Sequence, residues 1–252
     1  MGQKGEKQRL DQRMVADGLA PTRQRAQAYI LAGAVLVNDT PVTKAGSAIR
    51  NDAVVRLRAG TSDDYASRGA HKLKPAMETF AVDPNGLICL DIGASTGGFT
   101  DVLLRGSAAR VYAVDVGYGQ LAWKLRDHPD VVVLERTNAR YLTDEHIPEP
   151  VDLVVVDVSF ISVKLLLPAL WDRCANQAAV LLMVKPQFEA GKGRVGKGGV
   201  VRDETIRLET IRSVAEAATE LGFSVHGQRD NDIRGPKGNL ETFLYLKVNK
   251  GG

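Results

Sequence analysis

A glycine-rich turn after an apolar run is the segment of this chain best suited to hold a small charged molecule. Residues 87–90 are apolar and predict a buried parallel strand, and the segment from its end reads Asp91-Ile92-Gly93-Ala94-Ser95-Thr96-Gly97-Gly98-Phe99-Thr100. Glycines let the backbone turn tightly and present N–H groups to a ligand. A second apolar run, 111–114, ends at Asp115, where a carboxylate can accept hydrogen bonds from ribose hydroxyls. The two aspartates therefore predict a site for a nucleotide-like ligand.

Three interpretations compete for this turn. A dinucleotide is disfavoured because Ser95 stands where the G-x-G-x-x-G pattern needs its second glycine. The segment 93–97 also matches the G-x-S-x-G nucleophile elbow, with His226 late enough to complete a triad. Such an elbow normally follows several strands, whereas this one follows the first strand of its sheet. S-adenosylmethionine fits best, because its amino group and ribose need acceptors and its carboxylate needs N–H donors.

Ionisable residues close two later apolar runs. Asp157 follows 154–156 and Lys185 follows 180–184, at the strand ends where open α/β sheets bind ligands. A lysine that closes so apolar a strand is costly unless it has a function. Lys72 and Glu241 complete a quartet, in which we expect repulsion and burial to depress the proton affinity of one lysine, as a general base requires. Alternatively, Asp157 and Lys185 form one buried ion pair and Glu241 is a strand-face charge, but the four together favour catalysis.

Charge is unevenly distributed along the 252 residues. The formal net charge is +3, yet residues 1–60 contain ten basic and five acidic side chains, while the remainder contains 23 basic and 25 acidic ones. A basic module joined to a nearly neutral one suggests a polyanion-binding arm on an enzyme. The length is enough for one large or two modest domains.

Cysteine, histidine and apolar patterning argue for a cytoplasmic protein without a metal. Cys89 and Cys174 stand alone in apolar or helical surroundings, as reduced packing residues would. The four histidines form no zinc-ligand spacing, so we expect no metal. No apolar run approaches the roughly 20 residues that span a membrane.

The first sixty residues predict a small helix-helix-sheet fold. Helices are expected over 10–18, ending at a glycine, and 22–32, with Thr22 as N-cap, followed by short strands over 35–37 and 54–57. This region resembles the S4 RNA-binding domain in the residues Arg9-Leu10-Asp11, Gly18-Leu19-Ala20, Thr22-Arg23, Ala26, Ile30, Gly33, Val35, Val37-Asn38 and Val42. Asp39 and Thr22 depart mildly from that pattern, where the family often has Gly and Ser.

The S4 resemblance implies that the second helix and the adjoining turn face an RNA backbone. It places four arginines in the expected contact set: Arg9, Arg13, Arg23 and Arg25. Basic side chains that contact phosphate give affinity without sequence preference. An ordinary solvated helix face is the alternative interpretation, which the S4 pattern disfavours.

After a polar linker at 61–66, apolar strands and helices alternate. Following a helix over 67–80, strands are expected over 88–91, 111–115, 131–135, 153–157 and 179–185, with intervening helices over 99–105, 120–126, 163–171 and 205–221. This alternation predicts a mostly parallel sheet with helices on both faces. A closing strand pair over 223–229 and 242–248 fits the methyltransferase variant of the doubly wound, Rossmann-like α/β fold.

The quartet Lys72, Asp157, Lys185 and Glu241 resembles the tetrad of the FtsJ-like ribose 2′-O-methyltransferases. With the S4 module, nearly the whole chain is similar to the TlyA family of rRNA cytidine 2′-O-methyltransferases, also in the segments Ser67-Arg68-Gly69-Ala70-His71-Lys72-Leu73, Asp115-Val116-Gly117-Tyr118-Gly119-Gln120-Leu121, Glu135-Arg136-Thr137-Asn138-Ala139-Arg140 and Lys185-Pro186-Gln187-Phe188-Glu189. The resemblance implies a domain over 67–252 that methylates 16S or 23S rRNA.

The resemblance also implies roles for individual residues. Lys185 would accept or steer the ribose 2′-OH proton, Lys72 would orient the substrate, Asp157 would lie beside the methyl donor and Glu241 would hold a lysine. The expected S-adenosylmethionine contacts are Asp91, Gly93, Ser95, Gly97, Gly98, Phe99, Asp115, Val116, Asn138 and Asp157.

The loop over 187–202 is rich in glycine and cations. It nearly spells a phosphate loop, but Gly198 replaces the required Ser or Thr, so nucleotide hydrolysis is disfavoured. We expect either a flap that closes on RNA phosphates or a flexible surface loop. Its candidate RNA contacts, together with Arg68, are Lys192, Arg194 and Lys197.

Two other classes of function are open at this point. TlyA-like proteins have carried a hemolysin label, for which the chain offers no amphipathic or apolar membrane segment. A ribosome assembly factor with a vestigial cofactor pocket is the other alternative, against which the intact quartet argues. The residue pattern does not identify the modified nucleotide, the subunit or the oligomeric state.

Overall fold

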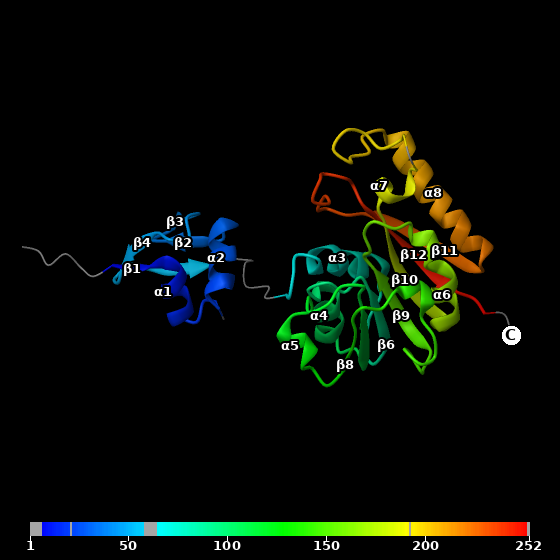
Figure 1. Cartoon of the computed structure of the whole chain (residues 1–252), viewed down its shortest axis with the longest axis horizontal. Helices are drawn as coiled ribbons and strands as arrows, with labels where there is room; N and C mark the ends of the chain where they lie inside the picture. The colour runs from blue at the N-terminus through cyan, green and yellow to red at the C-terminus, as the bar shows by residue number, and fades with distance from the viewer. Residues whose placement is uncertain (1–6, 21, 58–64, 192, 251–252) are drawn as a thin grey trace, which may run out of the picture. The chain divides into compact units, whose positions relative to one another are not determined.

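The computed structural model describes residues 7–20, 22–57, 65–191 and 193–250 (Figure 1). The chain separates into two compact units, Met1–Asp64 and Tyr65–Gly252. Most of the linker expected at 61–66 lies outside the described residues. Its last part does not behave as a linker, because the buried Tyr65 packs into the core of the second unit beside Arg105 and Ala66 N–H donates to Asp101.

The N-terminal unit is built on two short helices and two small sheets. Helix α1 (Leu10–Ala16) packs on α2 (Arg23–Leu31), whose N-cap Thr22 accepts a hydrogen bond from Arg25 N–H at 3.2 Å, as expected of a helix start. The strands are β1 (Lys7–Arg9) paired with β4 (Ala48–Arg50), and β2 (Val35–Val37) between β3 (Thr40–Pro41) and β5 (Val55–Leu57). Strands β1, β3 and β4 were not predicted, because two- and three-residue strands carry almost no alternation signal.

The second unit contains a seven-stranded sheet in the order β11-β12-β10-β9-β6-β7-β8. Strands β6 to β10 are parallel, and β12 is antiparallel to both β10 and β11, so the predicted closing pair is confirmed. The bounds are β6 (Ile88–Ile92), β7 (Arg110–Val114), β8 (Val131–Leu134), β9 (Val151–Val156), β10 (Cys174–Val184), β11 (Phe223–Asp230) and β12 (Thr242–Val248). The carboxyl ends of β6, β9 and β10 therefore lie side by side.

Helices pack on both faces of this sheet, and each face has its own apolar core. Helices α3 (Ala70–Phe80) and α4 (Gly98–Arg105) bury Leu73 and Leu103 on one face, while α6 (Leu167–Arg173) and α8 (Glu204–Glu220) bury Leu170 and Val214 on the other (Figure 1). The shorter helices are α5 (Trp123–Arg126), α7 (Pro186–Glu189), and the 3-10 turns η1 (Ala139–Tyr141) and η2 (Val163–Leu165).

Several predicted bounds were wrong for local reasons. The helix expected over 67–80 starts only at Ala70, and that over 120–126 only at Trp123, after Ala122 in an extended conformation. The helix expected over 163–171 is interrupted, since η2 gives way to α6 beside Pro168. Strand β10 begins five residues early because it continues past a register shift between Cys174 and Ala179.

Candidate active site

A cleft of about 800 Å³ opens in the second unit where the central strands end. Its walls come from the start of α3, the glycine-rich turn after β6, the ends of β9 and β10, the loop containing Gly199, and the hairpin between β11 and β12. All four residues of the predicted quartet line it: Lys72, Asp157, Lys185 and Glu241.

The quartet is a chain of alternating charges. Lys185 Nζ lies 2.5 Å from one Asp157 carboxylate oxygen, and Lys72 Nζ lies 3.6 Å from the other. Lys72 Nζ also contacts Glu241 at 2.7 Å. Lys185 is only 6% exposed and donates to Ser159 Oγ at 3.0 Å. The ion pair between Asp157 and Lys185, expected as the structural alternative, is present. It also forms part of the cleft wall, so it does not exclude a role of either residue in the cleft.

The pKa of Lys72 moves opposite to the depression expected of a catalytic lysine. Burial alone would lower the pKa of this ammonium, but the charge of Asp157 and the hydrogen bond to Glu241 outweigh burial and raise it above its ordinary value. Lys72 is therefore not the lysine of the quartet whose proton affinity is lowered. Two carboxylates interleaved with two lysines give each cation an anion as its nearest neighbour.

The glycine-rich turn follows β6 at the floor of the cleft. Gly93, Ser95, Gly98 and Phe99 line the cleft, whereas Gly97 does not. Gly93 has φ +84°, and a Cβ there would lie 2.5 Å from the Asp157 carbonyl oxygen. The turn therefore approaches the end of β9 more closely than any side chain would allow.

Asp91 lies buried beneath the turn and does not line the cleft. Its Oδ2 accepts a 2.6 Å hydrogen bond from Thr100, while its Oδ1 is buried with no partner among the described residues. Burial raises the pKa of Asp91 to about 7, despite the opposing bond from Thr100. An orphaned carboxylate oxygen under a turn of N–H groups suits a ligand that brings its own donor.

Asp91 should make the stability of the ligand-free protein depend on pH. Because the folded pKa is raised, the fold favours the protonated carboxyl, and stability is lost as the pH rises from about 4 to about 7. The Asp91→Asn substitution removes this penalty and keeps an acceptor for Thr100. Its stability advantage over wild type should grow by on the order of 2 kcal/mol between pH 5 and pH 8 in urea denaturation. Parallel curves for the two proteins would contradict this, and the exposed Asp127→Asn is the control.

The three remaining predicted cofactor residues lie at the ends of the next strands. Asp115 follows β7 and accepts from Ser95 N–H at 2.8 Å and Gly117 N–H at 2.7 Å. Val116 is 73% exposed, although it is apolar. Asn138 lies close to Asp115 in the chain's fold, because the preceding residue, Thr137, donates its N–H to the Asp115 carbonyl. The Asn138 side chain caps η1 by accepting a hydrogen bond from Arg140 N–H. Asp115 thus shapes the turn through backbone N–H groups, a role that the spacing alone did not indicate.

Four residues of this region were missed by sequence reasoning. Ser159, Phe160 and Gln187 line the cleft, and Asn239 lies buried behind it. The first three lie three or four residues after the ends of β9 and β10, so their proximity in sequence to Asp157 and Lys185 was the available signal. Phe160 is 90% exposed and has φ +67°, which is unusual for a large apolar residue.

Asn239 joins the glycine-rich loop to the hairpin that carries Glu241. Its side-chain oxygen accepts from Val201 N–H at 2.9 Å, and its amide nitrogen donates to the Gly199 carbonyl at 2.9 Å. In the same hairpin, Asn231 N–H donates to the Glu241 carbonyl at 2.9 Å. One buried amide therefore holds together two segments that both line the cleft.

The predicted RNA contacts lie in both units, and several are already engaged. In the N-terminal unit, Arg9 and Arg23 both donate to the fully buried Asp11 at 2.9 Å, and their bonds hold its pKa well below the usual range. Arg13 pairs with Asp17 at 2.7 Å, and Arg25 lies over the Tyr29 ring. In the second unit, Arg68 lines the cleft, Arg194 pairs with Glu209 and Lys197 is exposed, while Lys192 lies outside the described residues.

Metal binding, membrane insertion and hydrolase activity each require a feature that can be checked in the structure. Within the described ranges, no group of three His, Cys, Asp or Glu side chains is arranged to hold a metal ion. None of the helices in these ranges has the length and apolar composition needed to cross a bilayer. A hydrolase triad would need Ser95 to contact His226. The Ser95 hydroxyl instead contacts Gln120, and the exposed His226 contacts Ser224.

A seven-stranded sheet with an antiparallel β12 and a glycine-rich turn after its first strand defines a Rossmann-like methyltransferase. The model of the FtsJ-like methyltransferase family matches residues 65–248, and the S4 domain model matches residues 8–55. The chain belongs to the TlyA family of S4-containing, FtsJ-like methyltransferases.

Similar proteins support this membership. The 16S/23S rRNA (cytidine-2′-O)-methyltransferase TlyA of Mycobacterium tuberculosis is 49% identical over 240 residues, covering 95% of this chain and 90% of the relative. A Streptococcus thermophilus protein described as a hemolysin, with a solved structure, is 39% identical with a TM-score of 0.76, covering 97% of this chain and 90% of that one. The N-methyltransferase NodS of Bradyrhizobium japonicum, solved with S-adenosyl-L-homocysteine, shares the fold at 16% identity and TM-score 0.51, over 75% and 90% of the chains.

Proposed function

We propose that this protein transfers the methyl group of S-adenosylmethionine to a ribose 2′-oxygen of ribosomal RNA, at cytidine. The observation that carries the proposal is the quartet of Lys72, Asp157, Lys185 and Glu241, which faces the glycine-rich turn across one cleft. The printed activity of the Mycobacterium tuberculosis relative supports the substrate, and the basic N-terminal unit supports RNA binding. Residues 1–60 are then the RNA-binding module and 67–252 the catalytic domain.

The residues around the turn fit S-adenosylmethionine. Gly93, Ser95, Gly98 and Phe99 would hold its amino acid part, and the orphaned Asp91 oxygen provides an acceptor below the turn. At the neighbouring strand ends, Asp115, Val116 and Asn138 would hold the nucleoside, with the exposed Val116 against the adenine. When bound, S-adenosylmethionine supplies a methyl group on a cationic sulfur, and Asp157 provides the nearby negative charge.

The quartet provides the proton chemistry. Transfer of a methyl group to the ribose 2′-oxygen would require the 2′-OH proton to leave. Lys185, buried at the end of β10, accepts that proton at Nζ when it is uncharged. Lys72 stays charged between Glu241 and Asp157 and positions the ribose. Alignment of donor and acceptor supplies much of the remaining acceleration.

Exposed aromatic and basic groups fit the RNA around this site. Phe160 presents an exposed ring beside the cleft, on which the target base can stack. Phosphate contacts come from Arg9, Arg13, Arg23 and Arg25 in the N-terminal unit, and from Arg68, Arg194 and Lys197 in the second unit. Lys192, the remaining proposed contact, lies outside the described residues.

The decisive experiment is transfer of labelled methyl from S-adenosylmethionine to purified ribosomal subunits and to free rRNA, followed by nuclease mapping. Label at a ribose 2′-oxygen of cytidine is the expected result. Measurable binding of S-adenosylmethionine without transfer to any RNA would overturn the proposal and favour an assembly factor with a vestigial pocket.

A further inference from the structure

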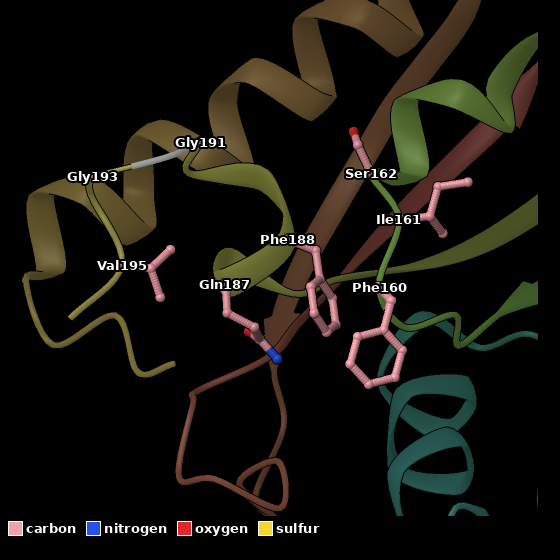
Figure 2. A pocket seen from close by; sticks show the side chains of 8 residues that line it. All are labelled: Phe160, Ile161, Ser162, Gln187, Phe188, Gly191, Gly193 and Val195. Carbon is pink, nitrogen blue, oxygen red and sulfur yellow. The ribbon is translucent and has the colours of Figure 1, made fainter. Parts of the chain in front are cut away.

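A second hollow of about 480 Å³ adjoins the cleft (Figure 2). The two share part of their lining, namely Phe160, Gln187, Phe188 and Val195. A ligand whose reacting atom lies at Lys185 can therefore extend without interruption into this hollow. In the proposed reaction the group attached to the reacting ribose is the target base, so the inference below rests on the proposed function.

The walls of the hollow suit a planar aromatic ring. The rings of Phe160 and Phe188 lie with centroids 5.4 Å apart and planes inclined by 50°. Phe188 projects from α7 and Phe160 from the loop after β9 (Figure 2). Ile161 and Val195 add apolar surface. Nucleobases that leave a helix are recognised in this way, by stacking on aromatic side chains and by hydrogen bonds to their edges.

Two polar side chains contribute to the lining, and only Gln187 has a buried acceptor without a hydrogen-bond partner among the described residues. Ser162 already donates to Glu189 at 2.6 Å. The Gln187 Oε1 atom is buried and has no hydrogen-bond partner among the described residues. A buried acceptor without a donor is unfavourable unless a ligand supplies the missing N–H group.

We propose that Gln187 determines base specificity by accepting a hydrogen bond from the exocyclic amino group of cytosine. Uracil has a carbonyl oxygen at that position, which would face the Gln187 oxygen as a second acceptor. Gln187 lies two residues after Lys185, so one short segment carries both the proton acceptor and the base reader.

The test compares ribosomal subunits that carry cytidine or, by substitution in the rRNA gene, uridine at the mapped position. Wild type should prefer cytidine in kcat/KM, and Gln187→Leu should lower the rate on cytidine on the order of tenfold and bring the two substrates close together. Gln187→Glu, which keeps an acceptor oxygen, should keep the preference. The exposed Gln228→Leu is the matched control and should behave as wild type.

A stability measurement separates base reading from a structural role. Because Gln187→Leu removes an orphaned acceptor, its Tm should equal or exceed that of wild type, and its affinity for S-adenosylmethionine should be unchanged. An unchanged cytidine preference in Gln187→Leu, or an equally indiscriminate Gln187→Glu, would overturn the inference while leaving the methyltransferase proposal intact. Absence of RNA methylation by wild type would instead remove the proposed function itself.

Discussion

Replacing Lys185 by methionine is expected to lower the single-turnover rate of methyl transfer by about 10³-fold, because the 2′-OH proton loses its acceptor. Methionine keeps much of the apolar volume at the end of β10, and Asp157 retains Lys72 at 3.6 Å, so the fold should persist. Binding of S-adenosylmethionine, measured by calorimetry, should change little.

Lys185→Arg tests whether this lysine acts as a base or only as a charge. Arginine keeps the positive charge beside Asp157 but cannot give up its proton at any accessible pH. We expect the Arg variant to be as slow as the Met variant. An Arg variant with near wild-type rate would refute the base role and leave Lys185 as a positioning charge. Lys74→Ala, on the exposed face of α3, is the control.

Gly93→Ala is expected to abolish binding of S-adenosylmethionine and to destabilise the protein by about 2–4 kcal/mol. The added methyl group would lie 2.5 Å from the Asp157 carbonyl oxygen and 2.9 Å from its carbon. These are backbone atoms of Asp157, the residue directly after β9, so relief requires the turn to move away from the end of that strand. That separation would also displace Asp157 from the two lysines, and methyl transfer should fall with cofactor affinity.

Gly86→Ala isolates the steric part of this effect. Gly86 also has positive φ, at +72°, but a Cβ there meets nothing within 4 Å. Its cost should be limited to the backbone strain, about 1 kcal/mol, with cofactor affinity unchanged. Equal effects of the two substitutions on denaturation and on calorimetric binding would show that the contact with β9 is unimportant.

The sheet and two residues of the quartet were predictable because their signals are local. Each parallel strand is a continuous apolar run, and Asp157 and Lys185 are the first polar residues after two of them. Strand topology then brings those ends together. Lys72 and Glu241 lie on other elements, and their pairing at 2.7 Å was expected only from the resemblance to FtsJ-like enzymes.

What could not be predicted depends on contacts between distant residues. The burial of Asp91 follows from its place under the turn and against Thr100, and an apolar run followed by aspartate fits an exposed carboxylate equally well. The raised pKa of Lys72 depends on its contacts with Asp157 and Glu241, which lie far from it in the sequence. The orphaned oxygen of Gln187 becomes evident only when every donor around it is known.

The double attachment of Asn239 ties two properties of the enzyme together. The loop with Arg194 and Lys197 faces RNA in the proposed reaction, and the hairpin fixes Glu241, which orients Lys72. Asn239→Ala removes both bonds, so it should loosen the loop and the hairpin together. A single buried side chain thus supports both the basic loop and the carboxylate that pairs with Lys72.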